Sequence, residues 1–97
     1  MKPVQFHPEA EVEADGAFEW YWERSEAAAW RFDNELRAAF SAVRKNPRTG
    51  APYLRGTRKL MLPTYPYLVV FRELPRKIEI IAVAHAKRRP GYWAKRI

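Results

Sequence analysis

The spacing of apolar residues changes once along this chain of 97 residues, from a helical period to an alternating one. Apolar side chains recur every three or four residues up to Asn46, which predicts helices, and alternate with polar ones from Thr57 onward, which predicts strands. A break at Arg24-Ser25 divides the helical part into two helices, joined tightly enough to lie antiparallel. The predicted strands are 3–7, 57–62, 67–74 and 77–85, and the predicted helices are 9–24 and 26–46.

This order of elements predicts an α+β fold, in which an antiparallel helical hairpin packs on one face of a small, mostly antiparallel sheet. Residues 48–56 are rich in turn formers and predict a loop with a short extended piece. The strand 77–85 is the most apolar, so we expect it to be central. A chain of this length holds one hydrophobic core, so residues 1–97 are expected to form a single domain.

Three local signals mark the helix ends. Pro8 suits a first helical turn, where its missing N–H costs nothing. Ser25 is a good N-cap for the second helix. Asn46 stands before Pro47 and is expected to end that helix, because the residue before a proline avoids the helical region.

Charge is distributed unevenly along the chain. Residues 1–46 hold nine acidic groups against six basic ones, a net of −3, whereas residues 47–97 hold two against twelve, a net of +10. Like charges crowded in one region repel each other, so this pattern favours a cationic working face on the second half. The alternative is a small basic protein that is merely kept soluble by its charge.

Several classes of protein are excluded or disfavoured by composition. The chain has no cysteine, so it has neither a disulfide nor a thiolate metal site. Metal-ligand spacing, a phosphate-binding glycine loop and a serine nucleophile motif are also missing, so we expect no cofactor, and any hydrolysis would be metal-free. The N-terminal residues do not resemble a signal peptide and no apolar run is long enough for a membrane span. We therefore expect a cytoplasmic protein that does not bind a membrane.

The last predicted strand leads directly into a segment rich in cations and aromatic rings. His85, at the strand end, can exchange a proton near neutral pH. The side chains after it suit a nucleic acid or another anionic partner. They are Lys87, Arg88, Arg89, Tyr92, Trp93, Lys95 and Arg96.

The same residues also have plain structural interpretations. His85 could bond to backbone, and Arg88 or Arg89 could pair with a helix acid such as Glu19 or Glu23 and hold the C-terminus in place. Both interpretations remain open at the level of sequence.

Further candidates lie on and around the other strands. Arg55, Arg58 and Lys59 are expected near the end of the last strand, where arginine forks could bind phosphate oxygens, unless they form a solvated sheet face. Base stacking needs exposed rings, and the candidates are Tyr65, Tyr67, Tyr92 and Trp93. Of these four, we expect Tyr67 and Trp93 to pack inside, and Tyr65 and Tyr92 to be exposed.

The helical hairpin carries an excess of tryptophan. Trp20, Trp22 and Trp30 place rings on more than one helix face, and a single sheet cannot bury them all. This pattern predicts a surface that a partner protein covers, since large exposed apolar patches usually mark interfaces. Alternatively, the rings fold back over the hairpin.

Four blocks of sequence occur in a fixed order and cover nearly the whole chain. They are V-x-F-x-P-E-A at 4–10, G-x-R at 56–58, Y-P-Y-L-V-V-F at 65–71 and I-x-I-I-A-V-A-H-x-x-R-x-P-x-Y-W-x-x-R at 78–96. On these blocks the chain resembles the RelE/ParE superfamily of toxins from bacterial type II toxin–antitoxin systems. The resemblance implies a growth-arresting toxin with a helical hairpin on a small sheet. It also implies a cognate antitoxin, acidic and partly disordered before it binds, which the aromatic helices and basic face would suit.

The superfamily contains two kinds of toxin, and the resemblance leaves both open. RelE-like members cut mRNA in the ribosomal A site without metal. In that case His85 is the base or acid, Arg58 and Arg88 clamp the phosphate, and Tyr92 stacks or donates a proton. The residues that would bind ribosomal RNA or the mRNA backbone are Arg89 and Lys59. ParE-like members instead poison DNA gyrase by binding, with no chemistry of their own.

Overall fold

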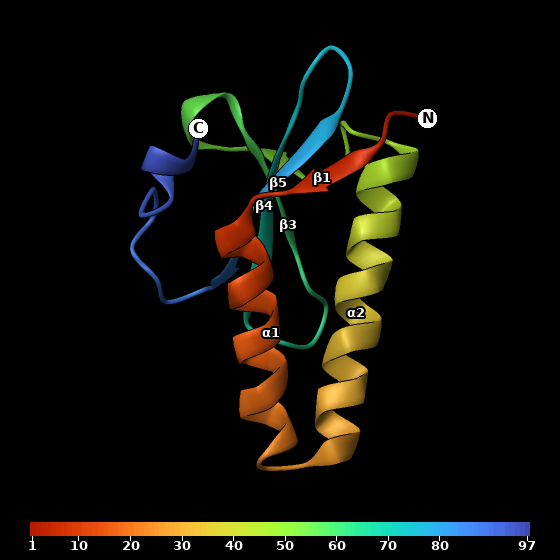
Figure 1. Cartoon of the computed structure of the whole chain (residues 1–97), viewed down its shortest axis with the longest axis vertical. Coiled ribbons are helices and arrows are strands. Elements are labelled where there is room, and N and C mark those ends of the chain that lie inside the picture. Colours follow the sequence, from red (N-terminus) through yellow and green to blue (C-terminus); the bar gives the residue numbers. More distant parts are fainter.

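The computed structural model describes all 97 residues and has two helices against one face of a five-stranded sheet (Figure 1). The strands are β1 (Val4–Phe6), β2 (Ala51–Pro52), β3 (Arg58–Met61), β4 (Tyr67–Glu73) and β5 (Ile78–His85), and the helices are α1 (Pro8–Trp22) and α2 (Glu26–Lys45). One-turn 3₁₀ helices lie at Leu54–Gly56 and Ala94–Arg96. The predicted α+β fold is confirmed, and β2 is the short extended piece expected within 48–56.

Side-chain caps start both helices near the residues that the sequence indicates. The Glu9 N–H donates to His7 Nδ1 at 3.1 Å, directly before α1. The Ala28 N–H donates to Ser25 Oγ at 3.2 Å at the start of α2. Each cap satisfies a backbone donor that has no partner within its helix. At the other end, α2 stops before Asn46, whose backbone is extended as the following proline requires.

The sheet has the strand order β1-β5-β4-β3-β2, and every pair is antiparallel except β1 with β5. As expected, β5 is an interior strand. Its pairing with β4 shifts register by one residue, since Val70 pairs with Ala82 and Phe71 with Ile80. β1 pairs only with residues 78–80, so the second half of β5 has no strand on that side.

The main core lies between the helices and the sheet. α2 contributes a stripe of buried residues three or four positions apart, namely Ala29, Phe32, Leu36, Ala39 and Val43. Val69 and Phe71 of β4 face this layer, while their neighbours Leu68 and Val70 face the other side, because side chains alternate along a strand. That other side is covered by Trp93 and not by a helix. Neither helix combines the length and the apolar character needed to cross a membrane.

Candidate functional site on the C-terminal segment

Residues 86–97, called here the C-terminal segment, fold back over the sheet face opposite the helices. Trp93 is the anchor of this segment: it is buried against Val70, Ile81 and Ala82. Gly91, with φ +83°, makes the turn before it in a conformation that favours glycine. Truncating a buried aromatic side chain typically costs about 3–5 kcal/mol, so Trp93 fixes the segment firmly.

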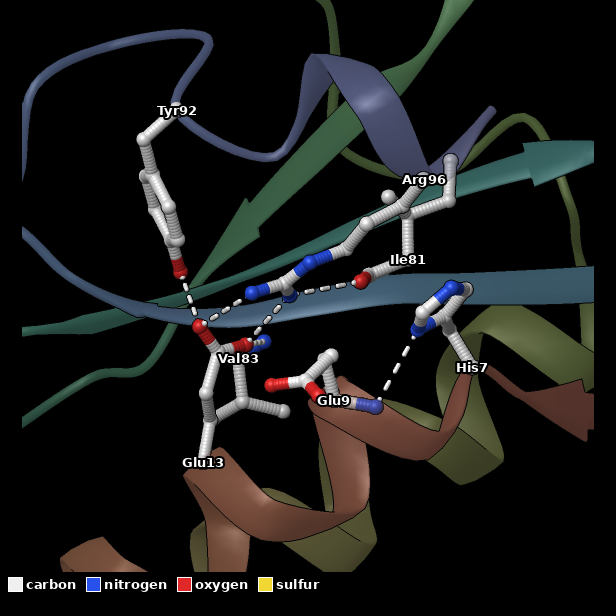
Figure 2. A network of polar contacts seen from close by, with 7 residues as sticks. All are labelled: His7, Glu9, Glu13, Ile81, Val83, Tyr92 and Arg96. Carbon is white, nitrogen blue, oxygen red and sulfur yellow. Dashed lines mark hydrogen bonds and ion pairs between the residues drawn. The ribbon is translucent and has the colours of Figure 1, made fainter.

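An ion pair fills the place beside β5 that β1 is too short to reach. The Val83 N–H and the Ile81 carbonyl lie beyond the three residues of β5 that β1 covers. Glu13 Oε1 accepts from the Val83 N–H at 3.1 Å, and Arg96 Nη1 donates to the Ile81 carbonyl at 3.1 Å (Figure 2). The two charged side chains also pair with each other, at 2.8 Å and 3.1 Å. This carboxylate therefore joins α1, β5 and the C-terminal segment.

Tyr92 is the fourth member of this network. Its hydroxyl donates to Glu13 Oε2 (Figure 2). Burial and this hydrogen bond together raise the pKa of the Tyr92 hydroxyl above its ordinary value. The hydrogen bonds to Glu13 likewise raise the pKa of the Arg96 guanidinium. Both groups therefore stay protonated and hold the carboxylate from two directions.

A cavity of about 280 Å³ opens between the C-terminal segment and β3, β4 and β5. Its wall includes Lys59, Met61, His85, Arg88, Arg89 and Tyr92, and it contains no carboxylate. We call this space the basic cavity. It brings together His85 and five other candidate residues, namely Lys59, Arg88, Arg89, Tyr92 and Trp93. All but Lys59 belong to the segment that ends the sequence.

His85 itself is half-buried at the rim of this cavity. Its Nδ1 accepts a hydrogen bond from the Lys87 N–H at 3.1 Å, and its ring lies edge-on to Tyr67 with 5.1 Å between centroids. The backbone interaction is the one that the plain structural interpretation expects. Nε2 is the nitrogen left for a ligand.

Arg58 does not join the cavity, contrary to expectation. Arg58 pairs with Phe71 across β3 and β4, whereas His85 pairs with Tyr67 four residues away, a separation of about 13 Å along the sheet. The Arg58 guanidinium instead donates to three backbone carbonyls, those of residues 48, 49 and 50, at 2.6–3.1 Å. Since neighbouring residues on a strand point to opposite faces of the sheet, Lys59 reaches the cavity and Arg58 does not.

Two aromatic residues expected to be exposed are partly packed. The Tyr65 hydroxyl donates to the Ala28 carbonyl at 2.9 Å, and its ring contacts the helix-side core. The Tyr92 hydroxyl is bound to Glu13, as described above, although the face of its ring borders the basic cavity. The expectation of a buried ring is confirmed for Trp93, whereas Tyr67 is only partly buried and packs against the helix-side core.

The other cations predicted to bind a target are either exposed or held in an ion pair within the protein. Arg55, Lys87 and Lys95 are exposed, which leaves them free to contact a target. Arg96 is engaged by Glu13, and its side chain is only 14% exposed. An ion pair does hold the C-terminus to a helix, but Arg96 and Glu13 form it, in place of Arg88 or Arg89 with Glu19 or Glu23.

The comparisons with known proteins agree with this architecture. Residues 4–90 match the family model described as "ParE toxin of type II toxin-antitoxin system, parDE". The chain belongs to the ParE toxin family. It is thus the toxin component of a type II toxin–antitoxin module, with a cognate antitoxin as partner.

A solved structure supports the fold of the toxin. A chain from the chromosomal ParDE TA system from P. aeruginosa superposes with a TM-score of 0.78 at 18% identity, covering 90% of this toxin and 98% of that chain. At this identity the likeness concerns the fold alone. No match was found among curated proteins.

Trp20, Trp22 and Trp30 lie on the helical hairpin near its tip, where α1 ends and α2 begins (Figure 1). Trp20 is 51% exposed and Trp30 is 53% exposed, and Trp22 also reaches solvent. Trp22 and Trp30 still contact each other, with 6.1 Å between ring centroids. The rings therefore fold together only in part, and their role in binding the antitoxin stays a prediction.

Three residues of the toxin site were missed by sequence reasoning. Met61 is two residues after Lys59, so the alternation of β3 is a signal that could have placed both in the cavity. Tyr53, which also lines it, precedes β3 in an irregular loop and carries no such signal. Glu13 is one of several acids on α1, and nothing local distinguishes it from Glu9 or Glu11.

Proposed function

We propose that this toxin inhibits DNA gyrase by binding to it and catalyses no reaction of its own. The family model that matches the chain is that of ParE toxins, and ParE-like members of the superfamily act on gyrase. The observation that carries the proposal is the separation of Arg58 from His85. A RelE-like nuclease would need these two residues on the same phosphodiester, and here about 13 Å of sheet lies between them.

The hydrogen bonds of the candidate catalytic groups support the same conclusion. General acid catalysis needs a donor within reach of the leaving oxygen, with a pKa near the working pH. The Tyr92 hydroxyl is held by Glu13 and its pKa is raised, so it is a poor proton donor at neutral pH. Arg58 is held by the backbone of residues 48–50. Both would have to leave their partners before they could act on RNA.

One observation favours the nuclease as a second candidate. The basic cavity does gather His85, Arg88 and Tyr92 within a single concave site. Catalytic groups in a free enzyme are often poorly aligned and tighten only around substrate. The experiment below is therefore designed to separate the two functions.

The exposed cations give the toxin a surface for its target. Arg55, Lys87 and Lys95 contribute to this basic surface, which favours association with a negatively charged assembly such as gyrase on DNA. Gyrase acts on the chromosome, so this function places the toxin in the cytoplasm. The antitoxin, acidic and partly disordered when free, would cover the tryptophans at the hairpin tip and part of the same basic surface.

Two assays on the same purified toxin test the proposal. In the first, gyrase supercoils relaxed plasmid in the presence of toxin. In the second, a reconstituted translation reaction is followed by primer extension to map new 5′ ends on the mRNA. We expect inhibition of supercoiling and intact mRNA. Cuts confined to the codon in the A site, with supercoiling unaffected, would refute gyrase inhibition.

His85→Ala sharpens the distinction. Removing a general acid or base lowers a rate by about 10²–10⁴-fold, whereas removing one contact at the rim of a binding surface costs only a few-fold. We therefore expect His85→Ala to inhibit gyrase within a few-fold of the unchanged toxin. Arg31→Ala, which alters an exposed arginine on α2, is the matched control for loss of charge. A loss of the size expected for catalysis, confined to His85→Ala, would contradict inhibition by binding.

A further inference from the structure

The basic cavity differs from the rest of the molecule in how its cations are used. Elsewhere, arginines on the strands and the C-terminal segment bond to acceptors of the protein itself. Arg58 donates to carbonyls, Arg72 pairs with Glu79, and Arg96 pairs with Glu13. The cavity cations Lys59, Arg88 and Arg89 form no ion pair and no side-chain hydrogen bond. Their donors are free, although they share one concave site.

Aromatic rings hold two of these cations in position. The Arg88 guanidinium lies 3.8 Å from the centroid of the Tyr92 ring, and the Lys59 ammonium lies 4.4 Å from that of Tyr53. Cation–π contacts of this kind leave the hydrogen-bond donors free while they restrict the side chain. The Tyr92 ring is itself fixed by Glu13 (Figure 2). Because the donors are ordered in advance, a ligand loses less conformational entropy when it binds.

Charge and shape both indicate the kind of ligand. Three cations around one cavity with no carboxylate repel each other, and an anion bound among them relieves that repulsion. Arginine forks match the geometry of phosphate oxygens. The wall also has an apolar part, formed in part by Met61, which is 51% exposed, and Leu68. A volume of about 280 Å³ is at the lower end for ligand sites, so it suits a phosphate with its adjoining sugar.

We propose that the basic cavity binds a backbone phosphate of DNA, so that the toxin recognises gyrase together with the DNA that gyrase holds. This inference rests on the proposed function, because gyrase inhibition is what selects DNA among the polymers that carry phosphodiesters. Lys59, Arg88 and Arg89 supply the donors, and Tyr92 is the platform that orients Arg88. Lys87, exposed between the wall residues Ala86 and Arg88, extends the contact along the DNA backbone.

Binding of DNA by the toxin alone tests the cavity directly. The probe is a short fluorescent duplex of mixed sequence, followed by anisotropy over a range of salt concentrations with the full-length toxin. For B-DNA, the slope of log K against log salt concentration falls by about 0.9 for each phosphate contact that is lost. We expect Arg88→Ala, Arg89→Ala and Lys59→Ala each to weaken binding several-fold and to reduce the slope by about one contact.

Matched controls distinguish DNA binding at the cavity from general electrostatic attraction to the basic protein. Arg31→Ala on α2 and Arg76→Ala in the β4–β5 turn each remove an exposed arginine outside the cavity. They should leave the affinity and the slope almost unchanged. Thermal unfolding and circular dichroism confirm that each variant is folded. Equal losses in the cavity and control variants, or no binding of DNA, would overturn the assignment.

The gyrase assay distinguishes failure of this inference from failure of the proposed function. If cavity variants lose both DNA binding and inhibition of supercoiling, the inference is supported. If they bind DNA normally, the inference is wrong whether or not gyrase is inhibited. If the unchanged toxin binds DNA through the cavity but does not inhibit gyrase, the proposed function fails and the phosphate site stands. A single-stranded RNA of equal length that binds more tightly than the duplex would overturn the choice of DNA.

Discussion

Glu13 is the residue whose loss should reveal most about how this toxin holds its C-terminal segment. Its carboxylate receives hydrogen bonds from Val83, Tyr92 and Arg96 (Figure 2). Glu13→Ala removes all of these and leaves the Arg96 charge without its counter-ion at a site where the side chain is 14% exposed. We expect the variant to be less stable than the unchanged toxin, mainly through release of the C-terminal segment.

The size of the effect follows from the partners. Breaking a buried ion pair by removing one partner costs about 3–5 kcal/mol, and a single hydrogen bond to a charged group contributes about 1.5–3 kcal/mol. Because the Glu13–Arg96 pair keeps some contact with solvent, the lower end of the first range applies. A loss of about 3 kcal/mol in the free energy of unfolding lowers Tm by roughly 12 °C in a domain of this size.

Urea and thermal unfolding followed by circular dichroism measure this loss. Glu11→Ala, which removes an exposed acid from the same helix, is the control and should change stability by less than about 0.5 kcal/mol. A double-mutant cycle of Glu13→Ala with Arg96→Ala tests the interaction itself. We expect a coupling above about 1 kcal/mol. Additivity within about 0.5 kcal/mol would refute the idea that this ion pair joins the segment to α1.

Three further predictions concern single positions. Burial alone would raise the pKa of Glu35, but hydrogen bonds from the 63–66 turn outweigh it and lower that pKa. The ionised Glu35 therefore stabilises the fold above about pH 4.3, and this contribution is lost as pH falls through the lowered pKa. The destabilisation caused by Glu35→Gln, measured by urea unfolding, should shrink from about pH 7 to about pH 3. The pKa of Tyr92 is raised, so its contribution to the free energy of unfolding is complete below about pH 10 and declines above it. Tyr92→Phe should be less stable than the unchanged toxin at neutral pH, but it should lose less stability between about pH 8 and pH 11. Parallel losses in the two proteins would contradict this. Gly50 has φ +75°, and a Cβ there would lie 2.2 Å from the Lys59 carbonyl oxygen, so Gly50→Ala should lower the free energy of unfolding by more than about 2 kcal/mol. Gly16 on α1 has nothing within 4 Å of such a Cβ, so Gly16→Ala should raise it by about 0.5–1 kcal/mol in the same thermal assay.

Local features of the fold were predictable because they depend on residues close together in sequence. The helical period and the Ser25 cap define α2, and the alternation from Thr57 onward defines β3, β4 and β5. These patterns reflect the geometry of one element facing one core, so each can be recognised without its neighbours. The place of Lys59 near His85 was also predicted, since both lie on strands of one antiparallel sheet.

The prediction that Arg58 lies near the end of β5 was wrong, because the position of its side chain depends on strand register. Whether Arg58 or Lys59 reaches the end of β5 depends on the register of β3 against β4 and on which face each residue occupies. A shift of one residue reverses every side chain from one face to the other. The bond from the Tyr65 hydroxyl to the Ala28 carbonyl likewise joins residues 37 apart and could not be read from either segment.

By itself, the sequence determined the order and type of the elements, the apolar stripe of α2, the basic character of the second half and the resemblance to a toxin family. Each of these is carried by composition, by period or by a motif within a short segment. Only the tertiary structure decided that Glu13 meets Tyr92 and Arg96, and that Lys59, Arg88 and Arg89 share one cavity without an acid. Those contacts depend on where α1 and the C-terminal segment pack on the sheet, and packing is set by the whole core at once.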